Sequence, residues 1–319
     1  MRKAARILTR LTLSLIGAAL LVYLLCPQPP QLLHAPYSTR ISDADGRTLR
    51  LSLAADEHYR LPVKIEELPK HVRHAILQYE DQYFYQHPGV NPVSLLRGAY
   101  IRFFTNQRQL GGSTISMQLA RMRYGLNTRS LTGKARQILL ALQIERHHSK
   151  SEIFEAYLTL APYGGNVAGI SAAARIYFDK NVGELNLAEA LALSVIPQNP
   201  VKRHPQKRSA QARAARLRLA ERWQPDDVSV TELSALATAP LNIRADITRT
   251  FDAPHLSSFL IATRAPGDWR STIDRALQRR LNQAVRSYTE ANHYRGINNA
   301  SALLIDNRTM EVVASIGSA

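Results

Sequence analysis

Cysteine is nearly absent from this sequence: Cys26 is the only one, so no disulfide can form within the chain. Acidic residues are also scarce, with 25 Asp and Glu against 41 Lys and Arg, which gives a formal net charge of +16. This excess indicates either a generally basic surface or an anionic partner, such as nucleic acid, acidic lipid head groups or a phosphorylated substrate. A hydrophobic fraction of 45% excludes a disordered chain, and 319 residues are enough for two domains.

The N-terminal segment lacks a site for signal-peptide cleavage. Basic residues within 2–10 precede an apolar run of about 16 residues over 11–26, and no small-x-small pattern follows it. Leu25 is not the small residue that lipoprotein processing at Cys26 would need. We therefore predict a cytoplasmic tail over 1–10 and an uncleaved transmembrane signal anchor over 11–26, with the remaining chain exported.

The rest of the chain divides into three parts. Residues 27–68 form a proline-rich linker and then an alternating pattern around Asp45-Gly46, which predicts a hairpin over 39–53. Helical patterns dominate 69–240. Residues 241–319 begin with an irregular, proline-punctuated linker and continue with a helix and two strands, which we interpret as the incomplete start of a further α/β domain.

A helix that carries Val72 and Ile76 ends in two adjacent carboxylates, Glu80 and Asp81, followed by aromatic residues. We expect Pro88-Gly89 to stop this helix. A carboxylate held at a helix end beside aromatic side chains loses hydration, which raises its pKa and suits it to proton transfer. The alternative is a surface pair of acids that happens to adjoin core aromatics.

Two further stretches supply groups that bind anions. The loop Gly111-Gly-Ser113-Thr114 offers backbone amides and hydroxyls, and Gly133-Lys134-Ala-Arg136 offers cations at the start of a helix. A diphosphate leaving group needs such fixed donors, so together with Glu80 they suggest glycosyl transfer from a diphosphate. Taken alone, the Gly-Gly-Ser-Thr stretch is more often an ordinary loop, and Lys134 or Arg136 more often lies on a solvated helix face. The basic run over 202–223 is expected on the surface.

The order and spacing of four motifs make the sequence similar to a known family. The motifs are Glu80-Asp81-Gln-Tyr-Phe84-Tyr-Gln-His87-Pro-Gly89, Gly112-Ser113-Thr114-Ile-Ser-Met-Gln118, Lys150-Ser-Glu-Ile-Phe-Glu155-Ala-Tyr157-Leu158 and Gly165-Asn-Val-Ala-Gly169-Ile170. They resemble the peptidoglycan glycosyltransferase domain (family 51) of class A penicillin-binding proteins over roughly residues 40–200. Residues 271–278 and the two strands resemble the entry to the transpeptidase domain of those proteins.

The resemblance implies a mainly α fold, with a lysozyme-like glycosyltransferase domain over 69–240 and a truncated start of a transpeptidase domain over 241–319. It implies an enzyme that polymerises lipid II into glycan strands and releases undecaprenyl diphosphate. The expected location is the bacterial inner membrane, with the catalytic domain in the periplasm. Expected partners are lipid II, the growing glycan chain, membrane lipid and other cell-wall synthesis proteins, and no nucleic acid.

The resemblance also implies residue roles. Two glutamates would be catalytic, Glu80 as general base and Glu155 at the diphosphate side. The substrate-binding set would be Asp81, Phe84, His87, Ser113, Thr114, Gln118, Arg121, Lys134 and Gln137. Gln137 stands where the family usually has a glutamate; it cannot carry charge, so a metal or acid role of that glutamate does not transfer. The implied cofactor is at most a divalent cation, Mg²⁺ or Mn²⁺, at the diphosphate, with no protein metal ligand assigned.

Two other functions remain open. A lytic muramidase-like enzyme would share the fold and a catalytic glutamate but would cleave glycan, and the cations around Lys134 argue against it. A non-catalytic cell-wall scaffold agrees with Gln137 and with the lack of any Ser-x-x-Lys or Lys-Thr-Gly after Trp269. That lack predicts that this stretch of sequence forms no acyl adduct with a β-lactam.

Overall fold

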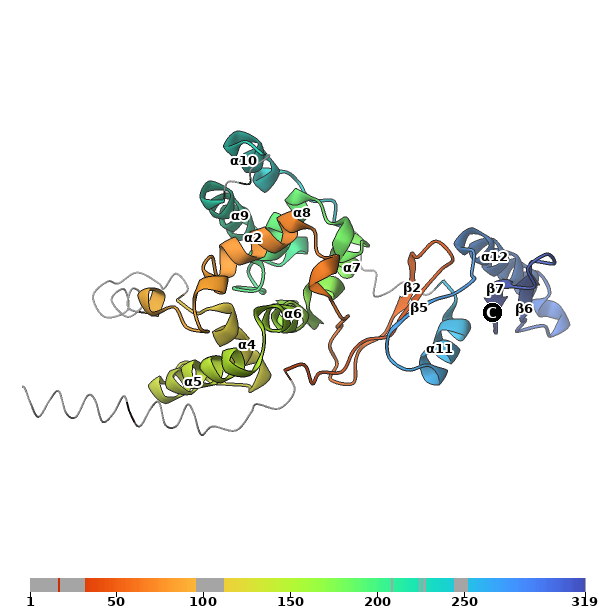
Figure 1. The fold of residues 1–319 in the computed structure, drawn as a ribbon. Coiled ribbons are helices and arrows are strands. Elements are labelled where there is room, and N and C mark those ends of the chain that lie inside the picture. The colour runs from red at the N-terminus through yellow and green to blue at the C-terminus, as the bar shows by residue number, and fades with distance from the viewer. Residues whose placement is uncertain are drawn as a thin grey trace, which may run out of the picture. The chain divides into compact units, whose positions relative to one another are not determined.

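The computed structural model describes residues 17, 32–95, 112–207, 209–223, 225, 228–243 and 252–318 (Figure 1). The predicted mainly helical fold is confirmed. Apart from Gly17, the predicted anchor over 11–26 lies outside the described residues. Within the described ranges, no helix has the length and apolar character needed to cross a membrane.

The chain divides into two compact units, and the division falls inside helix α2 (Lys70–Glu80). Unit 1 consists of Met1–His34 and Leu77–Leu160, and unit 2 of Ala35–Ile76 and Ala161–Ala319.

In its described residues, unit 1 contains the end of α2 and helix α4, with α5 and α6 packed against α4. After α2 its elements are η2 (Phe84–Gln86), α4 (Ile115–Arg123), α5 (Leu131–His147) and α6 (Lys150–Leu160). Their beginnings are capped by side chains: Thr114 accepts from the Met117 amide, and Ser130 accepts from the Gly133 amide. The Ser149-x-x-Glu152 spacing before α6 predicts a capping box, and both of its hydrogen bonds are present.

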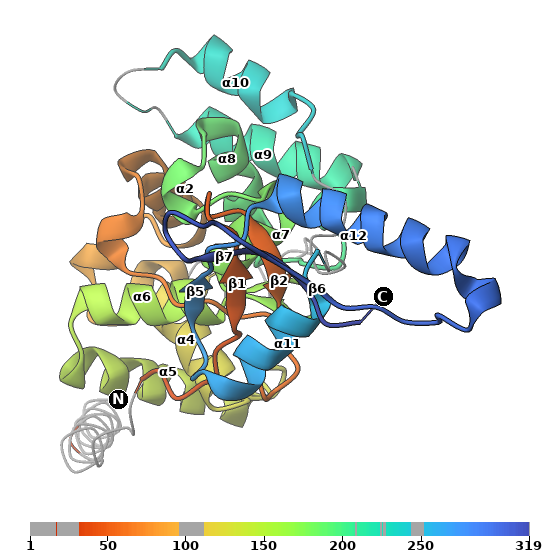
Figure 2. The ribbon, with the colours of Figure 1, turned by 90° about the vertical axis from the view of Figure 1, so that its right-hand side faces the viewer.

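The helical part of unit 2 includes η1 and the helices that follow the short antiparallel pair of β3 and β4. Its elements are η1 (Ile65–Glu67), β3 (Pro162–Gly164), β4 (Val167–Ala168), α7 (Ile170–Phe178), η3 (Val182–Glu184), α8 (Leu187–Val195), η4 (Pro205–Lys207), α9 (Ala210–Arg222) and α10 (Val230–Thr238). Helix α7 is buried along its whole length, as its small residues predict. Helices α8, α9 and α10 pack against one another (Figure 2).

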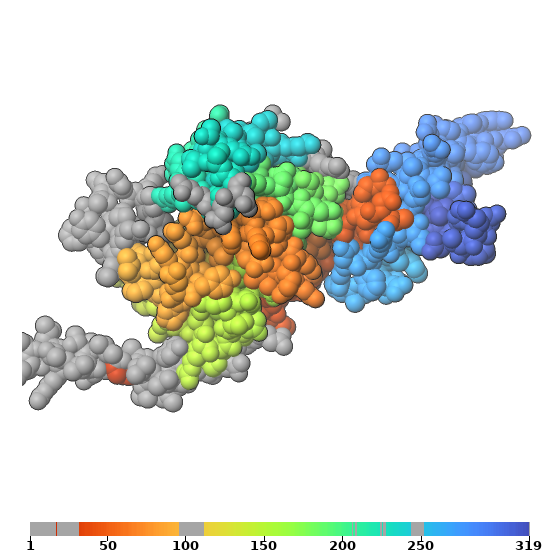
Figure 3. Space-filling view, turned by 45° about the horizontal axis from the view of Figure 1, so that its top comes forward, coloured from red at the N-terminus to blue at the C-terminus, as the bar shows by residue number. Residues whose placement is uncertain are grey.

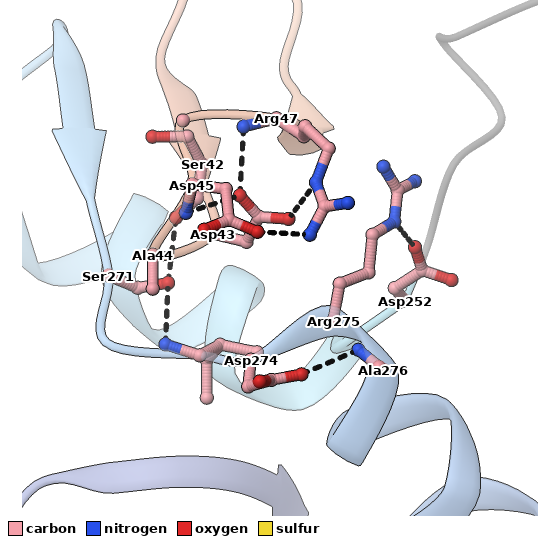
Figure 4. Close-up of polar contacts among 12 residues, drawn as sticks. Ser42, Asp43, Ala44, Asp45, Arg47, Asp252, Ser271, Asp274, Arg275 and Ala276 are labelled. Carbon is pink, nitrogen blue, oxygen red and sulfur yellow. Dashed lines mark hydrogen bonds and ion pairs between the residues drawn. The ribbon is translucent and has the colours of Figure 1, made fainter.

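The predicted hairpin forms in unit 2 from β1 (Arg40–Ser42) and β2 (Thr48–Leu51), which pair antiparallel. Gly46 takes a φ of 81° in the turn, a value that glycine adopts without strain. The Asp43 carboxylate accepts from the backbone amides of Asp45 and Arg47 and from Nε of Arg47, which closes the turn (Figure 4).

The stretch predicted to be irregular contains a helix, α11 (Pro254–Thr263), with Pro254 in its first turn. The prolines led us to expect no helix in this stretch, but proline disrupts a helix only beyond its first turn. The elements that follow are β5 (Asp268–Arg270), α12 (Arg275–Ala291), η6 (His293–Arg295), β6 (Ala302–Ile305) and β7 (Val312–Ile316). An aspartate just before a helical pattern predicts an N-cap, and Asp274 caps α12: its carboxylate accepts from the Ala276 amide. Arg275 pairs with Asp252 (Figure 4).

Strand β5 pairs in parallel with β1, which makes a three-stranded sheet of order β2-β1-β5. Arg40 is buried and forms a 2.6 Å ion pair with Asp268 on β5. Ile41, Leu49 and Ile273 form a small core beside this sheet. The C-terminal strands β6 and β7 form a separate antiparallel pair.

Candidate active site

The Glu80 carboxylate lies at the last residue of α2 and is 8% exposed. Nε2 of Gln118, on α4, donates a 2.7 Å hydrogen bond to Oε2 of Glu80. Helix α2 ends at Glu80, earlier than the break predicted at Pro88-Gly89. The physical reason lies in the next residue, because the Asp81 side chain bonds groups outside the helix.

Asp81 links three parts of unit 1. Its carboxylate lies 3.0 Å from Nε2 of His87 and accepts a 3.0 Å hydrogen bond from the amide of Ile115, the first residue of α4. Nδ1 of His87 accepts a hydrogen bond from the Gly89 amide at 3.2 Å. His87 therefore donates through Nε2, and this pair fixes the loop after Glu80 against the start of α4.

The Thr114 hydroxyl connects the loop after Glu80 to the start of α4. Oγ1 donates to the carbonyl oxygen of Gly89 at 2.6 Å and accepts from the Met117 amide at 3.2 Å. Thr114 is 3% exposed, so its side chain joins the Gly89 turn to the cap of α4. Gly89 has a φ of 93°, and a Cβ there would lie 2.7 Å from Cγ of Glu145, which only glycine avoids.

Lys134 connects α5 to the loop before α4. Its Nζ donates to Oγ of Ser113 and to Oε1 of Gln137, both at 2.9 Å. Nε2 of the buried Gln137 donates in turn to the Met117 carbonyl at 2.6 Å. Burial lowers the pKa of the Lys134 ammonium below its usual value, and the positive charge of Arg121 lowers it further.

The family usually has Arg-Lys-x-x-Glu where this chain has Gly133-Lys134-Ala-Arg136-Gln137. The structure explains why glycine stands at position 133. A Cβ on Gly133 would lie 1.9 Å from the carbonyl oxygen of Asn127 and 2.9 Å from Oγ of Ser130. The backbone of the preceding turn therefore occupies the space that an arginine side chain would need to leave the helix. This α5 start has room for glycine alone.

Phe84 packs in the interior of unit 1 at 1% exposure, with its ring centroid 5.9 Å from that of Phe154 on α6. Glu155 follows Phe154 and is half-buried. The structure thus brings the other candidate residues together around α4 and places Glu155 on a helix that packs against α4.

Three polar residues that the sequence interpretation did not assign support this arrangement. Nζ of Lys150 donates at 2.7 Å both to Oε1 of Glu145 and to the His87 carbonyl, and it lies 4.4 Å above the Phe84 ring. Oε1 of Glu145 also accepts from the Ser116 hydroxyl. The quoted motif contains Lys150, but nothing in the sequence indicates its contact with residue 87.

A divalent cation at this site would need the Gln137 side chain to be available as a ligand. Its side-chain oxygen already accepts from a cation, Lys134, and its nitrogen donates to Met117. In the described part of the chain, no three His, Cys, Asp or Glu side chains gather as metal ligands. Gln137, bonded in this way, therefore does not fit as a metal ligand.

Comparison with known proteins defines the class. The family model described as Transglycosylase matches residues 46–224, more than half of the chain, so the chain belongs to this family. It carries a glycosyltransferase domain of the kind found in penicillin-binding proteins of peptidoglycan synthesis, as its motifs predict.

The relatives include penicillin-binding protein 1C. The motifs Gly133-Lys134-Ala-Arg136-Gln137 and Ala161-Pro-Tyr-Gly-Gly165 predict similarity to this branch of the family. The chain is 32% identical to penicillin-binding protein 1C of Escherichia coli (strain K12), over 91% of this chain and 37% of that protein. It is 37% identical to penicillin-binding protein 1A of Aquifex aeolicus (strain VF5), over 54% of this chain and 24% of that protein. The chain thus spans less than two fifths of the length of either relative.

Among solved structures, the chain matches penicillin-binding protein 1A from Haemophilus influenzae with 18% identity and a TM-score of 0.37. The match covers 80% of this chain and 29% of that one.

Proposed function

We propose that the chain is a peptidoglycan glycosyltransferase that polymerises lipid II and releases undecaprenyl diphosphate. Glu80 acts as the general base and takes the proton of the acceptor sugar's 4-hydroxyl. The acceptor oxygen then attacks the anomeric carbon of the growing chain with inversion. The bond from that carbon to the diphosphate breaks, and the diphosphate leaves with the electron pair.

The observation that carries this proposal is the arrangement along α4. Gln118 bonds the Glu80 carboxylate, and Arg121, three residues later, lies on the same side of the helix. Nζ of Lys134 donates to Ser113, just before the Thr114 cap of α4, and to Gln137, which bonds the Met117 carbonyl of α4. A carboxylate held by α4, a cation on α4 and a cation beside the start of α4 therefore suit proton removal and diphosphate stabilisation by neighbouring groups.

The remaining candidate residues take supporting roles in this proposal. Asp81, His87 and Thr114 position the loop between Glu80 and α4, because their polar groups are bonded within it. Ser113 holds Lys134 at the diphosphate side, and Glu155 assists there. Phe84 acts through packing, since its ring is buried.

We also propose that the chain is held at the bacterial inner membrane by its N-terminal apolar run, with the catalytic domain outside the cytoplasm. The run over 11–26 follows several basic residues, which favours a cytoplasmic N-terminus. A reporter that works only outside the cytoplasm, fused after Ala319, is expected to be active. Activity of a cytoplasm-specific reporter at the same position would reverse the topology.

A polymerisation assay on lipid II tests the function, with the detergent-solubilised chain and its Glu80→Gln variant. Positioned general bases contribute about 100- to 10,000-fold in rate, so the variant should lose at least about 100-fold. Glu66→Gln, at an exposed acid of η1, is the matched control and should keep the parent rate. Glu80→Gln polymerising near the parent rate would refute the mechanism.

Measurements of lipid II binding and of cleavage of preformed glycan separate the two alternatives. A parent chain that binds lipid II but forms no polymer would support the scaffold. A chain that shortens preformed glycan would support the muramidase.

A further inference from the structure

A cavity of about 220 Å³ lies in unit 2, bounded by α8, the start of α9 and the segment that follows α10. The surface of α9 and α10 is drawn in turquoise in Figure 3. Most of the lining is apolar: Ala192, Val195, Ile196, Pro205, Ala212, Ala239, Pro240, Leu241 and Ile243. The polar lining residues are Arg203, Ser209, Arg213, Arg216 and Thr238. No described lining residue is acidic, and none belongs to the candidate active site.

The basic side chains reach the cavity because of their spacing on α9. Ser209, Ala212, Arg213 and Arg216 stand at positions i, i+3, i+4 and i+7, so they share one helix face. The basic run over 202–223 was expected to lie on the surface as a whole. This expectation is wrong for Arg216, which is only 9% exposed.

Arg216 is a buried cation whose charge is not neutralised within the described chain. Its Nε has no hydrogen-bond partner there. Its Nη1 donates one long hydrogen bond, at 3.5 Å, to the Ala239 carbonyl. Burial lowers its pKa below the usual value, and the charge of Arg213 lowers it further. Buried charges are normally paired, because removing an ion from water without a partner is costly.

Arg40 provides the contrast within the same unit. It is buried to a similar degree, but its guanidinium pairs with Asp268 at 2.6 Å and donates to the Thr48 hydroxyl at 3.0 Å. Among the described residues, Arg216 therefore has no acidic partner of the kind that Arg40 has, which indicates that a ligand supplies the anion.

We propose that this cavity binds an anionic amphiphile, with a carboxylate or phosphate head group on Arg216 and Arg213 and an apolar chain along α8 and the residues after α10. A guanidinium suits both head groups because its N–H donors match two oxygens at once. The apolar majority of the lining excludes a bare ion as the best ligand. The volume exceeds the roughly 150 Å³ of an engineered apolar cavity that accepts benzene, so the head group and several methylenes fit.

Titration of the full chain, in a fixed concentration of nonionic detergent, tests the proposal. The probes are octanoate, octyl phosphate, the neutral octanamide and inorganic phosphate, and the readouts are calorimetry and the thermal unfolding midpoint. We expect at least one anionic octyl probe to bind about tenfold or more tightly than octanamide, since hydrogen bonds between charged partners are the strong ones. It should also bind more tightly than inorganic phosphate. The better of octanoate and octyl phosphate identifies the head group.

Variants then locate the site. Arg216→Met keeps most of the side-chain volume and should weaken anionic probe binding about tenfold or more. Arg218→Met, at an exposed arginine two residues along α9, should bind as the parent does. Ala212→Leu should block the apolar part of the cavity and weaken binding of both anionic octyl probes.

Several outcomes would overturn the proposal. They are octanamide binding as tightly as both anionic probes, inorganic phosphate binding as tightly as the octyl probes, or Arg218→Met losing as much affinity as Arg216→Met. If Arg216→Met does not fold, two results still test the proposal. They are the relative affinities of the parent for the four probes and the loss of binding in Ala212→Leu.

Discussion

Gln118 donates a 2.7 Å hydrogen bond to the carboxylate of Glu80 across 38 positions of sequence. This contact gives the proposed base a defined orientation, because the carboxylate can no longer rotate freely about its last bond. It also makes Gln118 a positioning residue whose removal should affect the chemical step more than substrate binding.

The first prediction follows from that contact. Gln118→Met removes the donor and keeps the side-chain length. Hydrogen bonds to charged groups contribute about 1.5–3 kcal/mol, so kcat for polymerisation should fall by about tenfold or more with KM little changed. Steady-state kinetics on lipid II measure both, with Gln211→Met, at an exposed position of α9, as control. A changed KM with an unchanged kcat would contradict the positioning role.

The second prediction concerns pH and Lys134. Its pKa is lowered by burial and by Arg121, so the ammonium is charged below that lowered pKa and neutral above it. If Lys134 holds the diphosphate, kcat/KM should fall as pH rises through a value below the usual lysine pKa. Lys134→Arg should move this alkaline decline to higher pH, because arginine stays charged.

The measurement is the pH profile of kcat/KM, which reports groups of the free enzyme. Lys202→Arg, at an exposed lysine, provides the control and should leave the profile unchanged. An alkaline decline at the same pH in the parent and in Lys134→Arg would assign the decline to another group.

The third prediction concerns Gln137. Sequence alone would favour a gain in turnover or a change in metal dependence when the family's usual glutamate is restored. The structure predicts a cost instead, because Gln137→Glu removes the amide that donates to the buried Met117 carbonyl. An unsatisfied buried polar group costs about 1–3 kcal/mol, so the thermal unfolding midpoint should fall.

Calorimetry measures this midpoint for the parent, Gln137→Glu and the exposed control Gln211→Glu. Polymerisation with and without a chelator measures metal dependence. An unchanged midpoint together with a new divalent-metal requirement would show that residue 137 is a metal position after all.

The fourth prediction tests the small core of unit 2. Ile273 is 1% exposed and packs with Ile41 and Leu49. Ile273→Ala should cost about 2–5 kcal/mol of unfolding free energy, through lost burial and the cavity left behind. Leu303→Ala, at 58% exposure, should change stability by less than about 0.5 kcal/mol. Equal effects of the two substitutions would mean that residues 40–51 and 273 do not share a core.

Local patterns in the sequence determined much of what was predicted correctly. The hairpin at Asp45-Gly46, the capping box at Ser149, the Asp274 cap and the strand pair over 302–316 all depend on residues within a few positions of each other. The motifs likewise carried the family, because their order and spacing are properties of the chain itself. The predicted catalytic and binding roles remain to be tested by the variants above.

Tertiary structure alone decided the contacts between distant segments. The parallel pairing of β1 with β5, the bond from Lys150 to residue 87 and the burial of Arg216 join residues that no local pattern links. The Asn127 carbonyl explains why glycine stands at position 133, and the Met117 carbonyl explains the amide of Gln137. Neither contact can be inferred from the sequence. The physical reason is that caps and turns depend on nearby backbone groups, whereas burial and long-range hydrogen bonds depend on which elements pack together.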